Sequence, residues 1–320
     1  MKIAVVGAGW VGCHLSKIFL DKGIDFDLFD KEGIFSSTSS KNQNRLHQGY
    51  HYARSKNTRV LCKSTFSQFK KEYGFLTTPI NKNLYSVHKD SILDLGTYKD
   101  IFLQEDLKYI ESDIKLNNCL GTLETQEELI SFTKAKSYFT NLLSKFLKIQ
   151  KIQDLEDLSK NYTYVINCTN NSIPSPNIKG FYELSLTLLY NKINPIEFGA
   201  LTIVDGPFFS IFPYQDNLYT LTDVEHTPLL TNTFLPFDLN IKEIVDKKRK
   251  LMEQKTLLVY PTFLKNFKYH SFYVSTKSKT YNNFADRSPV IDVEKNIINI
   301  FTGKIQGIFK IEEFVLNHII

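Results

Sequence analysis

The chain opens with Met1-Lys2-Ile3-Ala4-Val5-Val6-Gly7-Ala8-Gly9-Trp10-Val11-Gly12, where an apolar run leads directly into three closely spaced glycines. The apolar run predicts a buried strand over residues 2–7, and the residues after the glycine turn predict a helix over 10–22. A second strand, predicted over 25–30, ends in Asp30. The order of strand, glycine turn, helix, strand and acid predicts a Rossmann-type βαβ unit in an α/β fold.

Each residue of this motif has a mechanical task in such a unit. Gly7 permits the tight turn, Gly9 lets the backbone approach a pyrophosphate, and Gly12 lets the helix pack closely on the strand. The helix N-terminus offers unpaired N–H groups and the positive end of its dipole to phosphates. Asp30 stands where a carboxylate accepts hydrogen bonds from ribose hydroxyls. The motif therefore predicts a bound dinucleotide.

Length and composition set wider limits. The 320 residues suit two domains, and the formal net charge of +5 includes no dense basic block. The basic cluster at 247–250 falls on a predicted amphipathic helix over 241–252, where a solvated helix face is the simpler interpretation, so we expect no nucleic acid. The four scattered cysteines fit reduced thiols of a cytoplasmic protein, and no metal-binding spacing is present. We expect no membrane-spanning segment.

Later segments predict that a second domain is inserted into the α/β domain, whose pattern returns at the C-terminus. Residues 126–147 have helical periodicity, with Thr125 as N-cap and Glu127 and Glu128 in the first turn. A run of predicted strands suggests an antiparallel sheet inserted into the α/β domain, at 182–190, 200–204, 208–214 and 219–224. Strand 297–301, a Thr-Gly-Lys turn and a helix return to the α/β pattern. The predicted cofactor domain comprises 1–80, 120–178 and 288–320, and the predicted substrate domain 81–119 and 179–287.

With these segments placed, the chain resembles the FAD-dependent amino-acid oxidase superfamily, the glycine oxidase and sarcosine oxidase type of flavoprotein. The resemblance rests on the glycine motif with Asp30, on Ser39-Ser40 with Asn44-Arg45, on the segment 165–170, and on the C-terminal turn 302–307. Asn170 stands where the family has a glycine, and the C-terminal turn departs from the family's glycine-rich form. The resemblance implies bound FAD, a Rossmann-type FAD-binding domain with an inserted antiparallel substrate domain, and reduction of the flavin directly by an organic substrate.

The candidate cofactor contacts follow the motif and the resemblance. They are Gly7, Ala8, Gly9, Trp10, Val11, Gly12, Asp30, Lys31, Ser39, Asn44, Arg45, Leu46, Ile152, Thr169, Asn170, Gly303, Lys304 and Ile305. Reduced flavin carries negative charge, and a cation or helix N-terminus close by stabilises it. Gly303 and Lys304, at a strand-to-helix turn, can supply close approach and positive charge.

The candidate catalytic residues gather in one polar and aromatic stretch. Residues 45–54 read RLHQGYHYAR and hold two of the chain's five arginines. Strand alternation would place Arg45, His47 and His51 on one side, where either histidine could act as a base near neutral pH. Arg287 could bind a substrate carboxylate or phosphate, and Tyr214 belongs to an aromatic strand that could line the substrate pocket.

Three functions are compatible with these residues. The first is an FAD-dependent oxidoreductase that removes a hydride from a C–N or C–OH bond of a small polar metabolite. The second is an NAD-dependent dehydrogenase of the sugar-nucleotide type, because the first twelve residues of this chain resemble that family equally well. It lacks support because no cysteine stands in a Gly- and Pro-rich context and the C-terminal cofactor turn has no place there. The third is a flavin-bound protein without turnover. Oligomeric state is left open by the sequence.

Overall fold

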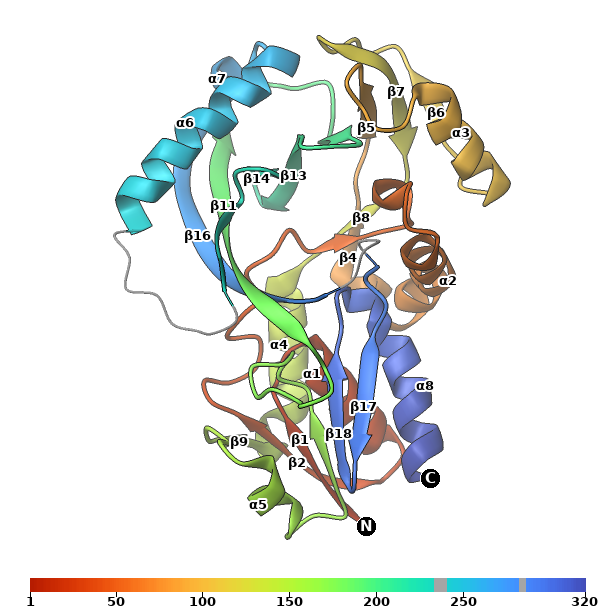
Figure 1. Cartoon of the computed structure of the whole chain (residues 1–320), viewed down its shortest axis with the longest axis vertical. Helices are drawn as coiled ribbons and strands as arrows, with labels where there is room; N and C mark the ends of the chain where they lie inside the picture. The colour runs from red at the N-terminus through yellow and green to blue at the C-terminus, as the bar shows by residue number, and fades with distance from the viewer. Residues whose placement is uncertain (233–240, 282–285) are drawn as a thin grey trace.

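The computed structural model describes residues 1–232, 241–281 and 286–320, which form two large sheets placed one above the other (Figure 1). The lower sheet carries the glycine motif and both chain termini. It is parallel except for its edge strand β17, which pairs antiparallel with β18. Its order is β17 (Val290–Glu294), β18 (Ile297–Phe301), β10 (Tyr164–Asn167), β1 (Lys2–Val6), β2 (Asp25–Asp30) and β9 (Leu147–Ile149).

Both faces of the lower sheet are covered, as the continuous apolar run of β1 requires. Ile3 and Val5 point into the larger core, which α1 (Trp10–Asp21), α4 (Phe132–Leu143) and α8 (Ile308–Ile319) close. Ala4 and Val6 point to the opposite face, against α5 (Leu155–Ser159). The predicted strand–helix–strand unit at the N-terminus and the predicted strand at 297–301 are confirmed.

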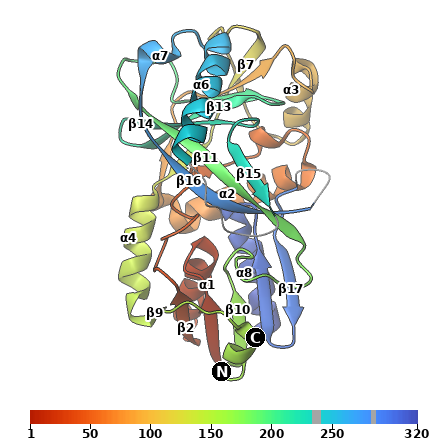
Figure 2. The same cartoon turned by 60° about the vertical axis from the view of Figure 1, so that its left-hand side comes forward.

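The upper sheet is antiparallel except where β12 pairs with β5. Its strands are β15 (Pro228–Asn232), β11 (Gly180–Lys192), β14 (Leu218–Asp223), β13 (Phe209–Gln215), β12 (Ala200–Val204), β5 (Asn83–His88), β7 (Cys119–Thr125), β6 (Ile110–Ser112) and β16 (Phe267–Thr280), which pairs with β11. Helix α6 (Ile241–Val259) lies against β13 and β14, followed by α7 (Phe263–Asn266) (Figure 2). Helix α3 (Leu95–Gln104) covers the other end.

A small antiparallel sheet lies between the two large ones. It consists of β3 (Arg45–Leu46), β8 (Glu128–Ile130) and β4 (Thr77–Pro79), beside α2 (Lys56–Tyr73). The prediction of one helix over 126–147 is wrong at its start, because helix α4 begins after the N-cap Ser131 and ends at Leu143. Pairing of β8 with β3 and β4 replaces the first helical turn, and Glu127 becomes a buried loop residue.

Helices α1, α2 and α8 meet at a buried histidine. The ring of His14 is 1% exposed, with Nδ1 2.7 Å from the Tyr73 hydroxyl and Nε2 2.9 Å from a carboxylate oxygen of Glu312. Two polar partners therefore satisfy both nitrogens inside an aromatic core. In the described part of the chain, no helix has the length and apolar character needed to cross a membrane.

We expect Tyr73→Phe to lower the free energy of unfolding by about 1–3 kcal/mol, because it leaves a buried ring nitrogen of His14 without a partner. Urea unfolding measures the change. Tyr138→Phe is the matched control, since Tyr138 packs in the same aromatic cluster and its hydroxyl makes no hydrogen bond within the described residues. Equal stability losses in the two variants would contradict this account.

Candidate functional site

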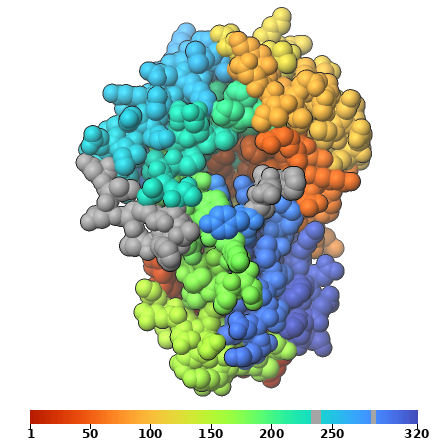
Figure 3. Space-filling model, viewed as in Figure 1, coloured from red at the N-terminus to blue at the C-terminus, as the bar shows by residue number. Residues whose placement is uncertain are grey.

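A cavity of about 660 Å³ lies between the two large sheets, where the carboxyl ends of β1, β10 and β18 face the underside of the upper sheet. Figure 3 shows the surface hollowed at this level. The floor is formed by the glycine motif and the C-terminal turn, and the roof by β11, β12, β13 and β16. The volume falls in the range of small-molecule and cofactor sites.

The glycine motif packs as tightly as its sequence predicts. A Cβ on Gly12 would lie 1.8 Å from the carbonyl oxygen of Gly7, so α1 sits against the end of β1 without a side chain between them. Gly7 has a φ of +104°, which favours glycine. A Cβ on Gly9 would lie 2.8 Å from the hydroxyl of Ser39, and that hydroxyl accepts a hydrogen bond from the backbone N–H of Trp10 at 3.2 Å.

Asp30 organises the turn that faces this motif. One carboxylate oxygen accepts a hydrogen bond from the N–H of Ala8 at 2.8 Å, and the other accepts bonds from the N–H groups of Glu32 and Gly33 at 2.9 Å each. The Ser36 hydroxyl adds a longer contact of 3.5 Å to the oxygen that faces Glu32 and Gly33, whereas the oxygen facing Ala8 has a single donor and keeps acceptor capacity for a ribose hydroxyl. Asp30 thus also fixes the backbone of two turns by accepting their N–H groups, a role that the sequence motif alone does not reveal.

The C-terminal turn brings two cations to the cavity floor. The side chain of Arg287 packs on Gly303, where a Cβ would lie 3.0 Å from Arg287 Cδ. Lys304 Nζ lies 4.6 Å from the ring centre of Tyr52. Asn170 has a φ of +53°, so it keeps the left-handed conformation that a glycine would adopt, and its side-chain oxygen accepts from the N–H of Thr302 at 3.4 Å.

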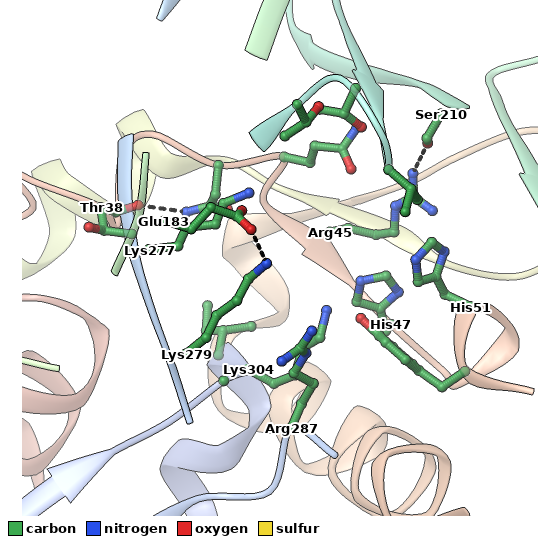
Figure 4. Close-up of a pocket in the computed structure, with 18 of the residues that line it drawn as sticks. Thr38, Arg45, His47, His51, Glu183, Ser210, Lys277, Lys279, Arg287 and Lys304 are labelled. Carbon is green, nitrogen blue, oxygen red and sulfur yellow. Dashed lines mark hydrogen bonds and ion pairs between the residues drawn. The ribbon is translucent and has the colours of Figure 1, made fainter. Parts of the chain in front are cut away.

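Arg45 connects the small sheet to the upper sheet. Its guanidinium donates to the hydroxyls of Tyr85 and Thr202 at 2.9 Å and to that of Ser210 at 2.7 Å (Figure 4). The guanidinium carbon lies 4.0 Å from the ring centre of Phe212. Three hydroxyls and one aromatic face thus fix the guanidinium of Arg45. Arg45 in turn joins the small sheet to the upper sheet at the edge of the cavity.

Glu127 lies beside Arg45 with its side chain fully buried. One carboxylate oxygen is 3.3 Å from His47 Nδ1 and accepts from the N–H of Gln48 at 3.0 Å. The other accepts from the hydroxyl of Tyr85 at 2.7 Å and lies 3.9 Å from Arg45. Burial alone would raise the pKa of Glu127, but His47, Arg45 and Tyr85 together lower that pKa to about 2, so the carboxylate is ionised.

The rings of His47 and His51 lie 5.8 Å apart at the cavity wall. His51 is an exposed residue in the cavity lining, and it has no hydrogen-bond partner among the described residues. Burial lowers the pKa of His51 well below 6.5, and neighbouring cations reinforce the shift. Burial, Lys304 and Arg45 lower the pKa of His47 to about 3 against the opposing effect of Glu127. Both imidazoles are therefore neutral near pH 7.

The roof of the cavity adds two lysines from β16. Lys279 pairs with the buried carboxylate of Glu183 on β11, one diagonal step along the ladder, because the residue directly opposite Glu183 is Lys277. Lys277, Arg287 and Lys304 have no carboxylate within ion-pair distance in the described chain, and Figure 4 shows all three facing the cavity. Burial lowers the pKa of Lys304 to about 8 and also lowers that of Lys277. The cavity is therefore cationic.

Most predicted site residues meet at this cavity. Its lining includes Gly9, Trp10, Val11, Ser39, Asn44, Arg45, His47, His51, Asn170, Arg287, Gly303, Lys304 and Ile305. Gly7, Ala8, Gly12, Asp30, Lys31, Leu46, Ile152, Thr169 and Tyr214 do not line it. Gly7, Ala8, Gly12 and Asp30 support the floor, and Leu46 is part of the core below.

Three of these residues make their contacts outside the cavity lining. Lys31 is exposed and pairs with Glu32, while Ile152 packs on the far face of the lower sheet. The Tyr214 hydroxyl donates to the carbonyl of Ser40 at 3.2 Å, which turns it away from the proposed pocket. Tyr52 also lines the cavity, because residues 50–52 form a 3₁₀ turn in place of the alternating strand considered for residues 45–54.

The lowered pKa values of the histidines make stability depend on pH. The unfolded chain takes up protons on His47 and His51 as the pH falls through 6.5, whereas folded His47 stays neutral until about pH 3. Stability is therefore fully present above pH 6.5 and declines below it. We expect the urea concentration at the unfolding midpoint to decrease when the pH is lowered from about 7.5 to about 5. His47→Gln should lose less over this interval, and the exposed His318→Gln should behave like the wild type. A pH dependence unchanged in His47→Gln would refute the assignment.

Comparison with known proteins identifies the family. The chain is 31% identical over 334 residues to the FAD-dependent monooxygenase FPY4 of Fusarium mangiferae, covering 98% of this chain and 90% of that protein. It is 24% identical over 364 residues to the FAD-dependent monooxygenase kojA of Aspergillus flavus, covering 99% and 85%. No family model matches the sequence.

Among solved structures, the glycine oxidase from Bacillus cereus superposes with a TM-score of 0.71 at 10% identity, covering 99% of this chain and 95% of that one. This similarity confirms the fold expected from the sequence motifs. The chain belongs to the family of FAD-dependent oxidoreductases that includes FPY4, and it has the fold of the amino-acid oxidase-like flavoproteins.

Proposed function

We propose that the cavity holds FAD along its floor and a small polar substrate at the His47 and His51 wall, and that a substrate carbon bearing an amine or a hydroxyl group loses a hydride, so that its C–N or C–OH bond is oxidised. The observation that carries this proposal is the continuity of the cavity, which runs from the N-terminus of α1 to the free imidazole of His51. One end suits a nucleotide phosphate and the other suits proton transfer.

The residues present fit the cofactor of the family. In the described chain, the first-turn N–H groups of Val11 and Gly12 have no hydrogen-bond acceptor, as expected of a helix N-terminus prepared for an anion. Gly9 keeps the approach to this turn free of a side chain, and Ser39 adds a hydroxyl. These residues would hold the pyrophosphate, and Asp30 would bind the ribose beside its backbone contacts.

When bound, FAD accepts a hydride equivalent from the substrate carbon. The negative charge that accompanies reduction needs a nearby cation, and Lys304 and Arg287 both face the cavity without a carboxylate partner. Lys304 has a pKa of about 8, so most of its population is charged near pH 7. These two side chains would favour the reduced cofactor.

The substrate's proton would pass to the histidine wall. Oxidation of C–OH to C=O, or of C–NH to C=N, releases a hydride from carbon and a proton from oxygen or nitrogen. Both His47 and His51 are neutral near pH 7, so each has a lone pair that can receive the proton. Besides burial, Lys304 and Arg45 help to lower the pKa of His47, and the negative charge of the reduced cofactor would offset their effect and make the imidazole a stronger base. The unpaired cation Lys277 in the roof would bind an acidic group on the same substrate, together with Arg287.

A second function has direct support from the names of the relatives, both of which are FAD-dependent monooxygenases. Insertion of one oxygen atom of O₂ into a substrate reduces the other atom to water and needs two further electrons. A separate reductant, such as a reduced nicotinamide, must then supply them. Hydride removal from the substrate needs no such reductant, so the two functions differ in what reduces the enzyme.

We expect Gly9→Ala to weaken FAD binding at least about tenfold, equivalent to ~1.4 kcal/mol, because the methyl group occupies the approach to the helix N-terminus. Bound FAD is measured by visible absorbance after extensive dialysis. Ser39→Ala removes the hydroxyl that the new methyl would contact, so the double variant Gly9→Ala/Ser39→Ala separates a local clash from lost binding. Gly74→Ala, at a helix end away from the cavity, is the control. A double variant that retains as much FAD as Ser39→Ala alone would contradict the assignment.

The proposed reaction predicts that a suitable amine or alcohol bleaches the bound flavin in the absence of oxygen and of nicotinamide. A panel of small polar amines, hydroxy acids and sugar derivatives, each with and without an acidic group, is mixed anaerobically with the holoenzyme and followed by absorbance. NADH and NADPH are tested alone as the comparison. Bleaching by nicotinamide only would favour the monooxygenase, and bleaching by neither would favour a flavin protein without turnover.

A further inference from the structure

The buried carboxylate of Glu127 makes more contacts than a structural ion pair with Arg45 requires. Arg45 Nη1 lies 3.9 Å away and is already satisfied by the hydroxyls of Tyr85 and Thr202. Three contacts of Glu127 are closer: the Tyr85 hydroxyl at 2.7 Å on one oxygen, and the backbone N–H of Gln48 at 3.0 Å and His47 Nδ1 at 3.3 Å on the other. One carboxylate oxygen is therefore within hydrogen-bond distance of the imidazole, which lines the cavity.

We propose that Glu127 is a positioning residue that holds His47 with its proton on Nδ1 and leaves Nε2 as the proton acceptor facing the cavity. The inference rests on the proposed function, in which this wall accepts the substrate's proton. It assigns the free nitrogen and the group that selects it, neither of which follows from the family or from the reaction class.

The chemistry of the contact selects one tautomer. An ionised carboxylate can only accept hydrogen bonds, so the 3.3 Å contact is favourable only when His47 Nδ1 carries the proton. The opposite tautomer would set the Nδ1 lone pair against a buried negative charge. Because the imidazole is neutral, a proton on Nδ1 leaves Nε2 unprotonated, and Nε2 has no partner among the described residues.

The surroundings of Glu127 keep the carboxylate charged and fixed. Gln48 N–H and the Tyr85 hydroxyl donate to its two oxygens, and Arg45 adds positive charge. The aromatic ring of Tyr52 lies 5.3 Å from the ring of His47, edge to face, and restricts its rotation. The imidazole is therefore held by a hydrogen bond on one edge and by packing on its face.

The neighbouring acid, Glu128 at the start of β8, provides a matched comparison. Glu128 directs its carboxylate to Lys70, with oxygens 2.7 and 2.8 Å from Nζ, and does not line the cavity. Glu127→Gln and Glu128→Gln each remove one negative charge at nearly unchanged volume. Only Glu127→Gln replaces the acceptor-only group next to His47 by an amide that can also donate.

The experiment uses the holoenzyme and its variants with ¹⁵N-labelled histidine, and long-range ¹H–¹⁵N spectra recorded near pH 7.5. The His47 signals are assigned by their loss in His47→Gln. We expect wild type and Glu128→Gln to show a protonated Nδ1 and an unprotonated Nε2, and Glu127→Gln to populate the other tautomer. Anaerobic flavin reduction by an active substrate should slow by roughly 10²-fold in Glu127→Gln and stay unchanged in Glu128→Gln.

The outcomes separate this inference from the proposed function. Wild-type His47 with its proton on Nε2, or an unaltered tautomer in Glu127→Gln, would overturn the role of Glu127 even if substrates bleach the flavin. The expected tautomers with no substrate-driven bleaching would support Glu127 and count against hydride removal. If Glu127→Gln does not fold, the wild-type spectrum and Glu127→Asp, which keeps the carboxylate and should keep the tautomer, still decide the question.

Discussion

The structure depends on the contact between the carbonyl of Gly7 and the Cα of Gly12, where even a methyl group has no room. This contact fixes α1 directly on the end of β1, so the first N–H groups of the helix point into the cavity. Asp30 then ties the end of β2 to the same turn through Ala8. The position of the cavity floor, and of everything bound above it, follows from this packing.

The upper half of the site is organised by charge. Arg45 crosses from the small sheet to hydroxyls of the upper sheet, and Glu127 is the buried counter-charge beside it. Glu183 neutralises Lys279 in the roof. The remaining cations, Lys277, Arg287 and Lys304, are half-buried around one cavity, and burial of unpaired positive charge is costly unless an anion is bound beside it. The site is thus electrostatically incomplete without its ligands, in keeping with a protein whose family binds a dinucleotide.

Sequence patterns predicted the parts of the fold that local physics determines. The glycine motif, β18 and the strands from β11 to β14 carry their own periodicity. The prediction of a first helical turn at Glu127 was wrong. Thr125 and the acids that follow it have the composition of a helix start, but the tertiary contacts of Glu127 with Arg45 and His47 are stronger than that local preference. Strand β16 escapes prediction because its cavity-facing residues are polar, which hides the alternation of a buried strand.

Of the candidate site, the stretch from Arg45 to His51 was recognisable by its composition, since arginines and histidines are rare in this chain. Glu127, Glu183, Lys277 and Lys279 were not recognisable, because ordinary Glu and Lys residues acquire meaning only from burial. Tyr214 shows the reverse error. Its strand was predicted correctly, but the side chain turns to Ser40 on the outer side of the pocket. A shift of one residue in strand register moves a side chain to the other face of the sheet, and the sequence alone does not give the register.

The ladder between β11 and β16 runs from Gly180 opposite Thr280 to Lys192 opposite Phe267, so the roof joins segments far apart in the chain. The cavity floor likewise combines the N-terminal glycines with the C-terminal turn. No local fragment contains both, and an unfolded chain consequently has no partial site with affinity for the cofactor. FAD then binds the native state alone. Its binding adds about 2.7 kcal/mol to the free energy of unfolding when the free cofactor is a hundredfold above its dissociation constant. The free energy of unfolding thereby depends on the concentration of free cofactor.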